Sequence, residues 1–94
     1  MRVEWHPLAR ADLAELVVYI ATDNVSAAYR VHDKIREQTE RLAAHPEIGR
    51  SGRVRGTREL VIPGTPYIAA YRLAGDVVTV LRVLHGARRW PQKL

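Results

Sequence analysis

The feature that most constrains the fold is a pair of apolar, β-prone runs near the C-terminus. The first run covers residues 66–72, Gly75-Asp76 supplies a short turn, and the second run covers residues 77–84. Val, Ile and Tyr favour extended backbone and glycine permits a tight turn, so the segment predicts a β-hairpin. The hairpin ends in a cationic and aromatic segment, residues 85–91. We therefore expect the functional surface to lie near this end of the chain.

The first half of the chain predicts one short strand followed by two helices. Residues 2–6 alternate in polarity and are stopped by Pro7. Residues 8–21 and the segment from Asn24, a predicted N-cap, to His45-Pro46 both show helical spacing of apolar residues. The side chains expected to face inward are Leu8, Leu13, Leu16, Val17 and Ile20 in the first helix and Ala28, Val31, Ile35, Leu42 and Ala43 in the second.

The remaining elements complete an α+β fold. Residues 46–56 hold three glycines and three arginines, which predicts an exposed basic loop, and residues 57–62 predict another strand. Both helices need a partner for their apolar stripes, and only a sheet is available. The order β-α-α-β-β-β therefore predicts a helical hairpin packed on one face of a small, mostly antiparallel four-stranded sheet. Residues 1–94 are expected to form a single domain whose other sheet face is partly open.

Charge is distributed unevenly along the chain. Residues 1–48 carry six Lys/Arg and eight Asp/Glu, whereas residues 49–94 carry nine Lys/Arg and only two Asp/Glu. A basic second half predicts contact with an anionic partner, such as nucleic acid or an acidic protein segment. The chain has no cysteine, no histidine pair with metal-ligand spacing and no apolar run long enough to span a bilayer. We expect a cytoplasmic protein without a metal or other cofactor and without membrane contact.

An ordered series of short motifs resembles the RelE/ParE toxin superfamily over nearly the whole chain. The motifs are Ala11-Asp12-Leu13 with Tyr19-Ile20, Asn24 with Ala27-Ala28, Leu42 with Pro46 and Gly49-Arg50, residues 56–60, Tyr67-Ile68 with Tyr71-Arg72, and residues 81–88. The resemblance implies the toxin of a type II toxin–antitoxin pair, held inactive by a small antitoxin. The basic second half predicts an acidic, amphipathic antitoxin that folds as it binds.

The superfamily includes two activities, and the resemblance favours one of them. ParE-like members poison DNA gyrase by binding, whereas RelE-like members cleave messenger RNA in the ribosome with Lys and Arg residues on the middle strands. At those positions this chain has Glu59, Val61 and Ile68. A ParE-like toxin is therefore expected, and catalysis is not. The alternative is a RelE-like endonuclease with a reduced acid–base site formed by Arg58, Arg82, His85 and Arg88.

The expected target-binding surface combines the basic loop with the C-terminal segment: Arg50, Arg53, Arg55, Arg82, Arg88, Arg89 and Trp90. Arg82 interrupts an apolar run, so it either faces a ligand or pairs internally with a carboxylate such as Glu59. Arg82 and His85 have opposite parity and share a face only if the strand ends or bulges between them. Tyr67, Tyr71 and Trp5 are expected in the core. A small basic nucleic-acid-binding domain without toxicity stays open as a third possibility.

Overall fold

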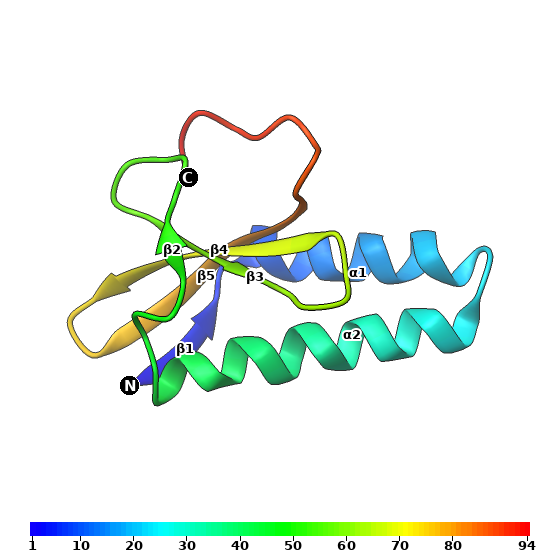
Figure 1. The fold of residues 1–94 in the computed structure, drawn as a ribbon, viewed down its shortest axis with the longest axis horizontal. Coiled ribbons are helices and arrows are strands. Elements are labelled where there is room, and N and C mark those ends of the chain that lie inside the picture. The colour runs from blue at the N-terminus through cyan, green and yellow to red at the C-terminus, as the bar shows by residue number, and fades with distance from the viewer.

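The computed structural model describes residues 1–94 and shows a helical hairpin beside a five-stranded sheet (Figure 1). Helix α1 spans Pro7–Ala21 and α2 spans Val25–Glu40, followed by a 3₁₀ turn, η1, at Arg41–Ala43. The strands are β1 (Arg2–Trp5), β2 (Arg50–Ser51), β3 (Arg58–Val61), β4 (Tyr67–Ala74) and β5 (Val77–His85). The predicted α+β class and element order are confirmed, with β2 as an additional strand.

Local capping explains where both helices begin. Pro7 occupies the first turn of α1, where no backbone N–H is needed, and the His6 ring accepts a hydrogen bond of 3.1 Å from the Leu8 N–H. The Asn24 side chain accepts one of 2.9 Å from the Ala27 N–H, as predicted. The two helices pack against each other, and their connecting end reaches beyond the strands (Figure 1). No helix is both long and apolar enough to cross a bilayer.

The sheet order is β1-β5-β4-β3-β2, so the N-terminal strand pairs with the last one. Strands β1 and β5 are parallel, with Arg2 opposite Val77 and Trp5 opposite Val80. The other pairs are antiparallel, including the predicted hairpin of β4 and β5. The register of this hairpin shifts between Ala70 and Tyr71, which leaves Leu81 as an extra residue in β5.

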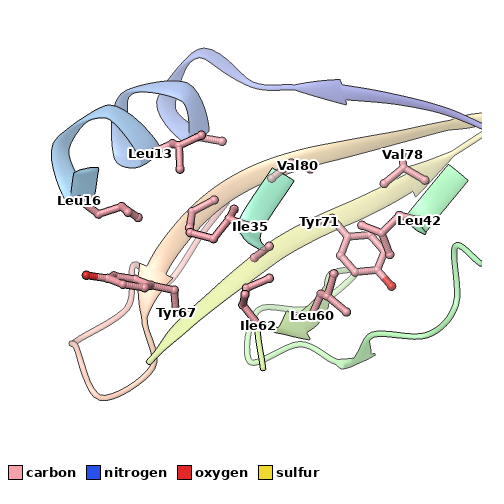
Figure 2. Packing of buried hydrophobic residues seen from close by; sticks show 13 residues of the cluster. Leu13, Leu16, Ile35, Leu42, Leu60, Ile62, Tyr67, Tyr71, Val78 and Val80 are labelled. Atoms are coloured by element: carbon pink, nitrogen blue, oxygen red, sulfur yellow. The ribbon is translucent and has the colours of Figure 1, made fainter. Parts of the chain in front are cut away.

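The core lies between the helices and one face of the sheet. Leu13 and Leu16 of α1 and Ile35 of α2 face Tyr71 and Val80 of the central strands (Figure 2). Tyr67 and Tyr71 are buried, and Trp5 packs against the same cluster, as expected. Burial of these aliphatic and aromatic side chains is the main favourable contribution to stability.

Three details differ from the sequence-based expectations. Leu8 is 53% exposed and does not belong to the core, because it sits in the first turn, on the outer side of α1. The second helix ends at Glu40 and continues as η1, several residues before Pro46. The segment expected as a loop contains β2, which adds a fifth strand at the sheet edge. A two-residue strand has too few residues to show an alternating pattern.

Candidate functional site

Arg82 forms a bidentate ion pair with Asp12 on α1. Its Nε and Nη2 donate hydrogen bonds of 2.7 and 2.9 Å to the two carboxylate oxygens. The same Asp12 carboxylate accepts a hydrogen bond of 3.0 Å from the Val83 N–H. The hydrogen bonds that Arg82 donates to Asp12 raise the pKa of Arg82, and partial burial opposes that shift. Arg82 therefore pairs internally, but with Asp12 and not with the suggested Glu59.

The topology explains why a carboxylate is needed at this place. Strand β1 ends opposite Val80, so the rest of β5 has no strand partner on that side. A buried backbone N–H without an acceptor is costly, and Asp12 supplies the acceptor for Val83. No further bulge separates Arg82 from His85, so these two side chains keep opposite parity. Arg82 is therefore a structural cation, with its fork already occupied.

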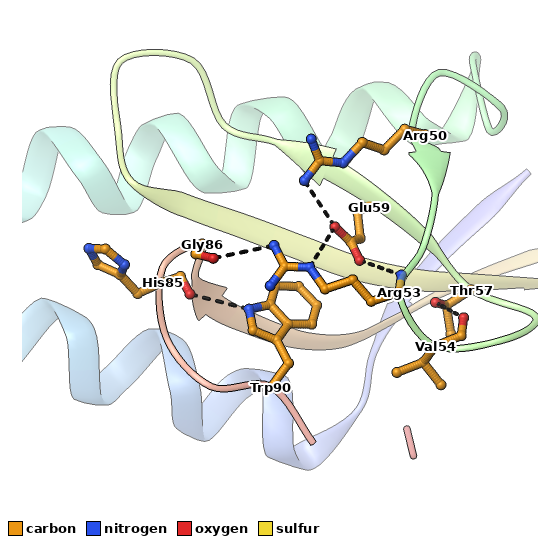
Figure 3. A network of polar contacts seen from close by, with 8 residues as sticks. All are labelled: Arg50, Arg53, Val54, Thr57, Glu59, His85, Gly86 and Trp90. Atoms are coloured by element: carbon orange, nitrogen blue, oxygen red, sulfur yellow. Dashed lines mark hydrogen bonds and ion pairs between the residues drawn. The ribbon is translucent and has the colours of Figure 1, made fainter. Parts of the chain in front are cut away.

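Glu59 organises the basic loop from a buried position. Its side chain is 1% exposed, and one oxygen lies 3.1 Å from Arg50 Nη2 and 3.5 Å from Arg53 Nε. Its other oxygen accepts a hydrogen bond of 2.7 Å from the Arg53 N–H (Figure 3). A buried carboxylate needs such partners because desolvation otherwise makes its charge costly. Arg50 and Arg53 therefore share one carboxylate as their ion-pair partner.

Arg53 also connects the loop with the C-terminal segment. Its guanidinium carbon lies 4.1 Å from the centre of the Trp90 ring, and its Nη2 donates to the Gly86 carbonyl at 3.3 Å. The Trp90 indole N–H donates to the His85 carbonyl at 3.3 Å (Figure 3). A cation over an aromatic face is favourable by about 0.5–1 kcal/mol at an exposed site. Glu59, Arg53 and Trp90 thus hold the loop and the tail together as one surface, which we call the loop–tail surface.

A groove of about 790 Å³ lies between α1 and the end of β5. Its apolar lining includes Leu16, Val18, Tyr19, Tyr67 and Leu84, and Arg88 and His85 lie at its edge. The ring of His85 meets that of Tyr67 edge-on at 5.8 Å between centroids, and its Nδ1 accepts a hydrogen bond of 3.1 Å from the Ala87 N–H. Burial raises the pKa of Tyr67, with a smaller contribution from Tyr19. The groove is thus mostly apolar, and its charged lining consists of the acidic residues Asp12 and Glu15 and the basic residue Arg88.

The structure separates Arg58 from the other residues of the alternative endonuclease site. Arg58 pairs opposite Tyr71 on β4, whereas His85 pairs opposite Tyr67, four residues away on the same strand. Four residues of a strand span about 13 Å. Arg88 lies with His85 at the groove, Arg58 lines a separate hollow with Arg55, and Arg82 is bound to Asp12. Arg89 is exposed and makes no ion pair.

Sequence reasoning missed Asp12 as a functional partner and Glu59 as an organiser. Asp12 lies three residues after Ala9 and four before Leu16, both buried, so it is in phase with the inward stripe of α1. That spacing indicates that the Asp12 side chain faces the core side of α1. The signal for Glu59 is that it is the only acidic residue between Arg50 and Arg72. Neither signal names its partner, because the partners come from distant or irregular segments.

Comparison with known proteins identifies relatives over almost the whole chain. A family profile described as ParE toxin of type II toxin–antitoxin system, parDE, matches residues 3–90. The candidate toxin Y4kP of Sinorhizobium fredii is 42% identical over 99% of this chain and 96% of its own length. Toxin RelE2 of Caulobacter vibrioides is 32% identical over 93% and 97%. A solved structure of the chromosomal ParDE toxin–antitoxin system from P. aeruginosa superposes with a TM-score of 0.80 at 28% identity, covering 90% of this chain and 95% of that one.

Proposed function

Since the chain belongs to the ParE toxin family of type II toxin–antitoxin systems, within the RelE/ParE superfamily, we propose that it inhibits growth by binding and poisoning DNA gyrase. One observation carries the choice of a binding mechanism. Arg58 lies in a hollow apart from the groove that His85 and Arg88 line, and Arg82 is already paired with Asp12. This arrangement supports a toxin that acts through its contact surface.

The chemistry of RNA cleavage supports this choice. Metal-free cleavage of a phosphodiester needs a base for the 2′-hydroxyl, an acid for the leaving oxygen and a cation on the phosphate, all within reach of one bond. Here the middle strands present Glu59, Val61 and Ile68 at the expected cation positions, and the Glu59 carboxylate is already engaged by Arg50 and Arg53. None of these three side chains can supply a cation to a phosphate.

The loop–tail surface is the proposed contact with the target. It offers the guanidinium groups of Arg50 and Arg53, which remain 56% and 40% exposed beside Glu59, and the ring of Trp90. Tryptophan and arginine are the residues most often responsible for binding energy in interfaces. Arg55, Arg88 and Arg89 are assigned to the same contact, whereas Arg82 is left out because its Nε and Nη2 donate to Asp12, which compensates its charge.

The groove beside α1 is the proposed seat of the antitoxin. An acidic, amphipathic segment would place apolar side chains against Tyr19 and Leu84 and a carboxylate beside Arg88. Such a segment would fold as it binds and cover part of the basic end of the sheet. Neutralisation would then follow from competition for Arg88 and the adjacent tail.

A gyrase assay tests the proposal directly. Purified toxin is expected to reduce supercoiling by gyrase or to increase cleaved DNA, and Trp90→Ala is expected to reduce this effect at least about tenfold, as for a central interface residue. Arg10→Ala is the matched control, because Arg10 is an exposed arginine on α1 outside the loop–tail surface. Unchanged gyrase activity at a toxin excess would refute the proposed target.

A ribosome-dependent endonuclease is the second candidate, and the similarity to toxins named RelE1 and RelE2 of Caulobacter vibrioides favours keeping it. Translating ribosomes with added toxin would then yield messages cut at reproducible positions. Loss of these cuts with His85→Ala, at unchanged folding, would support this function over gyrase inhibition. Harmless expression of the chain without an antitoxin, at verified protein levels, would instead leave a basic nucleic-acid-binding domain.

A further inference from the structure

A second hollow lies at the β2 end of the sheet and has no acidic side chain in its lining. It has a volume of about 460 Å³, and its polar lining comes from Ser51, Arg55, Gly56, Thr57 and Arg58. Two arginines face this space together with hydroxyl groups and a glycine turn. A hollow of this composition favours an anion, because each cation lacks a carboxylate of its own.

Arg58 is held in place without being neutralised. Its Nη1 donates to the Gly49 carbonyl at 2.9 Å and to the Glu47 carbonyl at 3.3 Å. No carboxylate lies within 4.0 Å of its guanidinium, and its other N–H groups have no partner in the protein. Carbonyls fix the orientation of the planar fork but leave its full positive charge available. Arg58 is therefore preorganised for a second, anionic acceptor.

The turn beside Arg58 adds further free donors. The Thr57 N–H donates to the Val54 carbonyl at 3.1 Å and closes this turn, and Gly56 adopts a φ of 80°, a conformation that glycine adopts at no steric cost. The backbone N–H groups of Arg55 and Gly56 and the Arg55 guanidinium have no hydrogen-bond partner. Neighbouring amides in a turn, next to arginine, are a common setting for binding phosphate.

Arg50, on the opposite face of strands β2 and β3, can be compared with Arg58. Arg50 pairs in register with Glu59, and the next residue, Ser51, pairs with Arg58. Successive residues of a strand point to opposite faces, so one face holds Arg50 with a carboxylate and the other holds Arg58 without one. Two arginines in nearly the same backbone setting thus differ in whether their charge is compensated.

We propose that Arg55, Arg58, Ser51 and the turn at residues 54–57 form a binding site for a phosphate group. The ligand is a tetrahedral oxyanion that accepts hydrogen bonds from the Arg58 fork, from Arg55 and from the turn amides. The phosphate is either a phosphodiester of a nucleic-acid backbone or a free phosphate. The site goes beyond gyrase inhibition, since it requires no gyrase to be filled.

Titration of the ¹⁵N-labelled full-length chain with inorganic phosphate, at constant ionic strength with chloride, tests the site. Saturable shifts of the backbone amide signals of residues 51–58 are expected. Arg55→Ala should weaken phosphate binding at least about fivefold, and folding should not change, because the Arg55 side chain contacts no other residue through hydrogen bonds or ion pairs. Arg50→Ala, the matched control, should change the affinity by less than about twofold, since Glu59 already neutralises Arg50.

A further titration distinguishes the two sources of the phosphate. A short single-stranded oligonucleotide that shifts the same signals at lower concentration, and that competes with phosphate, identifies a nucleic-acid backbone as the ligand. Binding of inorganic phosphate without an effect of the oligonucleotide identifies a free phosphate. Linear, unsaturable shifts, or equal losses for Arg55→Ala and Arg50→Ala, would overturn the proposed site. None of these outcomes depends on gyrase, so they leave the proposed function to its own assay.

Discussion

The buried side chain of Asp12 accepts three hydrogen bonds and thereby joins helix α1 to strand β5. It accepts two from Arg82 and one from the Val83 N–H. The ion pair is partly buried, with 23% of the Arg82 side chain exposed and 6% of the Asp12 side chain. Removing one partner of a buried pair is more costly than removing both, because the remaining charge has lost its compensation.

Replacement of Asp12 by alanine is therefore expected to destabilise the protein by about 3 kcal/mol. Urea unfolding monitored by circular dichroism measures this difference. Asp12→Asn keeps an acceptor for the Val83 N–H and is expected to cost less. A loss below about 1 kcal/mol for the alanine variant would contradict the role assigned to Asp12.

Tyr71 makes the stability of the protein sensitive to alkali. Burial raises the pKa of its phenol above 10.0, as it does for Tyr67, although the Gly49 N–H and Arg58 oppose the shift at Tyr71. At pH values between the unfolded and the folded pKa, the unfolded chain has lost the phenolic proton and the folded chain has kept it. The unfolded state then binds fewer protons, so the free energy of unfolding falls as pH rises above about 10.

Thermal unfolding between pH 8 and pH 11 tests this pH dependence. The wild-type midpoint is expected to fall above about pH 10. Tyr71→Phe lacks the titrating group, so its midpoint should start lower, because the hydrogen bonds to Gly49 and Pro46 are lost, and then fall less steeply. Parallel curves for the two proteins would show that Tyr71 does not titrate on unfolding.

At the scale of elements, the contacts that join the C-terminal tail to the basic loop all come from Arg53. Arg53 stacks on Trp90 and donates to Gly86, and Glu59, which lies between Arg50 and Arg53, fixes Arg53 (Figure 3). A cation–π contact and one hydrogen bond together contribute about 1–2 kcal/mol. The tail should therefore open when Arg53 is removed, without unfolding of the sheet.

Limited trypsin digestion measures that opening, since Arg88 and Arg89 are cleavage sites within the tail. Arg53→Ala is expected to accelerate cleavage after these residues by roughly tenfold, the ratio that corresponds to the lost contacts. Arg55→Ala is the matched control from the same loop, because Arg55 does not touch the tail. Equal cleavage rates in the two variants would show that Arg53 does not hold the tail.

The elements that the sequence predicts are those whose pattern is local. Hydrophobic spacing identified both helices, and the turn at Gly75-Asp76 identified the β4–β5 hairpin. Other contacts join residues that are far apart in the sequence. Asp12 and Arg82 are 70 positions apart, and β1 at residues 2–5 pairs with residues 77–80 of β5. No spacing rule reaches that far, and the partner of Arg82 could be recognised only as some carboxylate. The partners of Glu59 lie only six and nine positions away, but the loop that carries them is irregular and follows no spacing rule.

For the whole molecule, β5 is the element on which the rest depends. It lies between β1 and β4, contributes Val78, Val80 and Val83 to the core, and carries Arg82 to Asp12. The tail after Gly86 contributes no residue to that core. The two C-terminal segments therefore differ sharply in their importance for folding.

Truncated chains test whether β5 and the tail after Gly86 differ in their importance for folding. A chain that ends at Gly86 is expected to unfold cooperatively, with a modest loss of stability from the missing tail contacts. A chain that ends at Thr79 lacks residues 80–85 of β5, and with them the Arg82 partner of Asp12, and it is expected to be unfolded. Circular dichroism with a urea titration reads out both results. Cooperative unfolding of the shorter chain would contradict the central place of β5.

The parallel pairing of β1 with β5 has a consequence for synthesis in the cell. Strand β1 spans Arg2–Trp5, whereas its strand partner β5 spans Val77–His85. Residues 77–85 must leave the exit tunnel of the ribosome before β5 can pair with β1. The first strand of the sheet therefore waits, unpaired, while both helices and three other strands are synthesised.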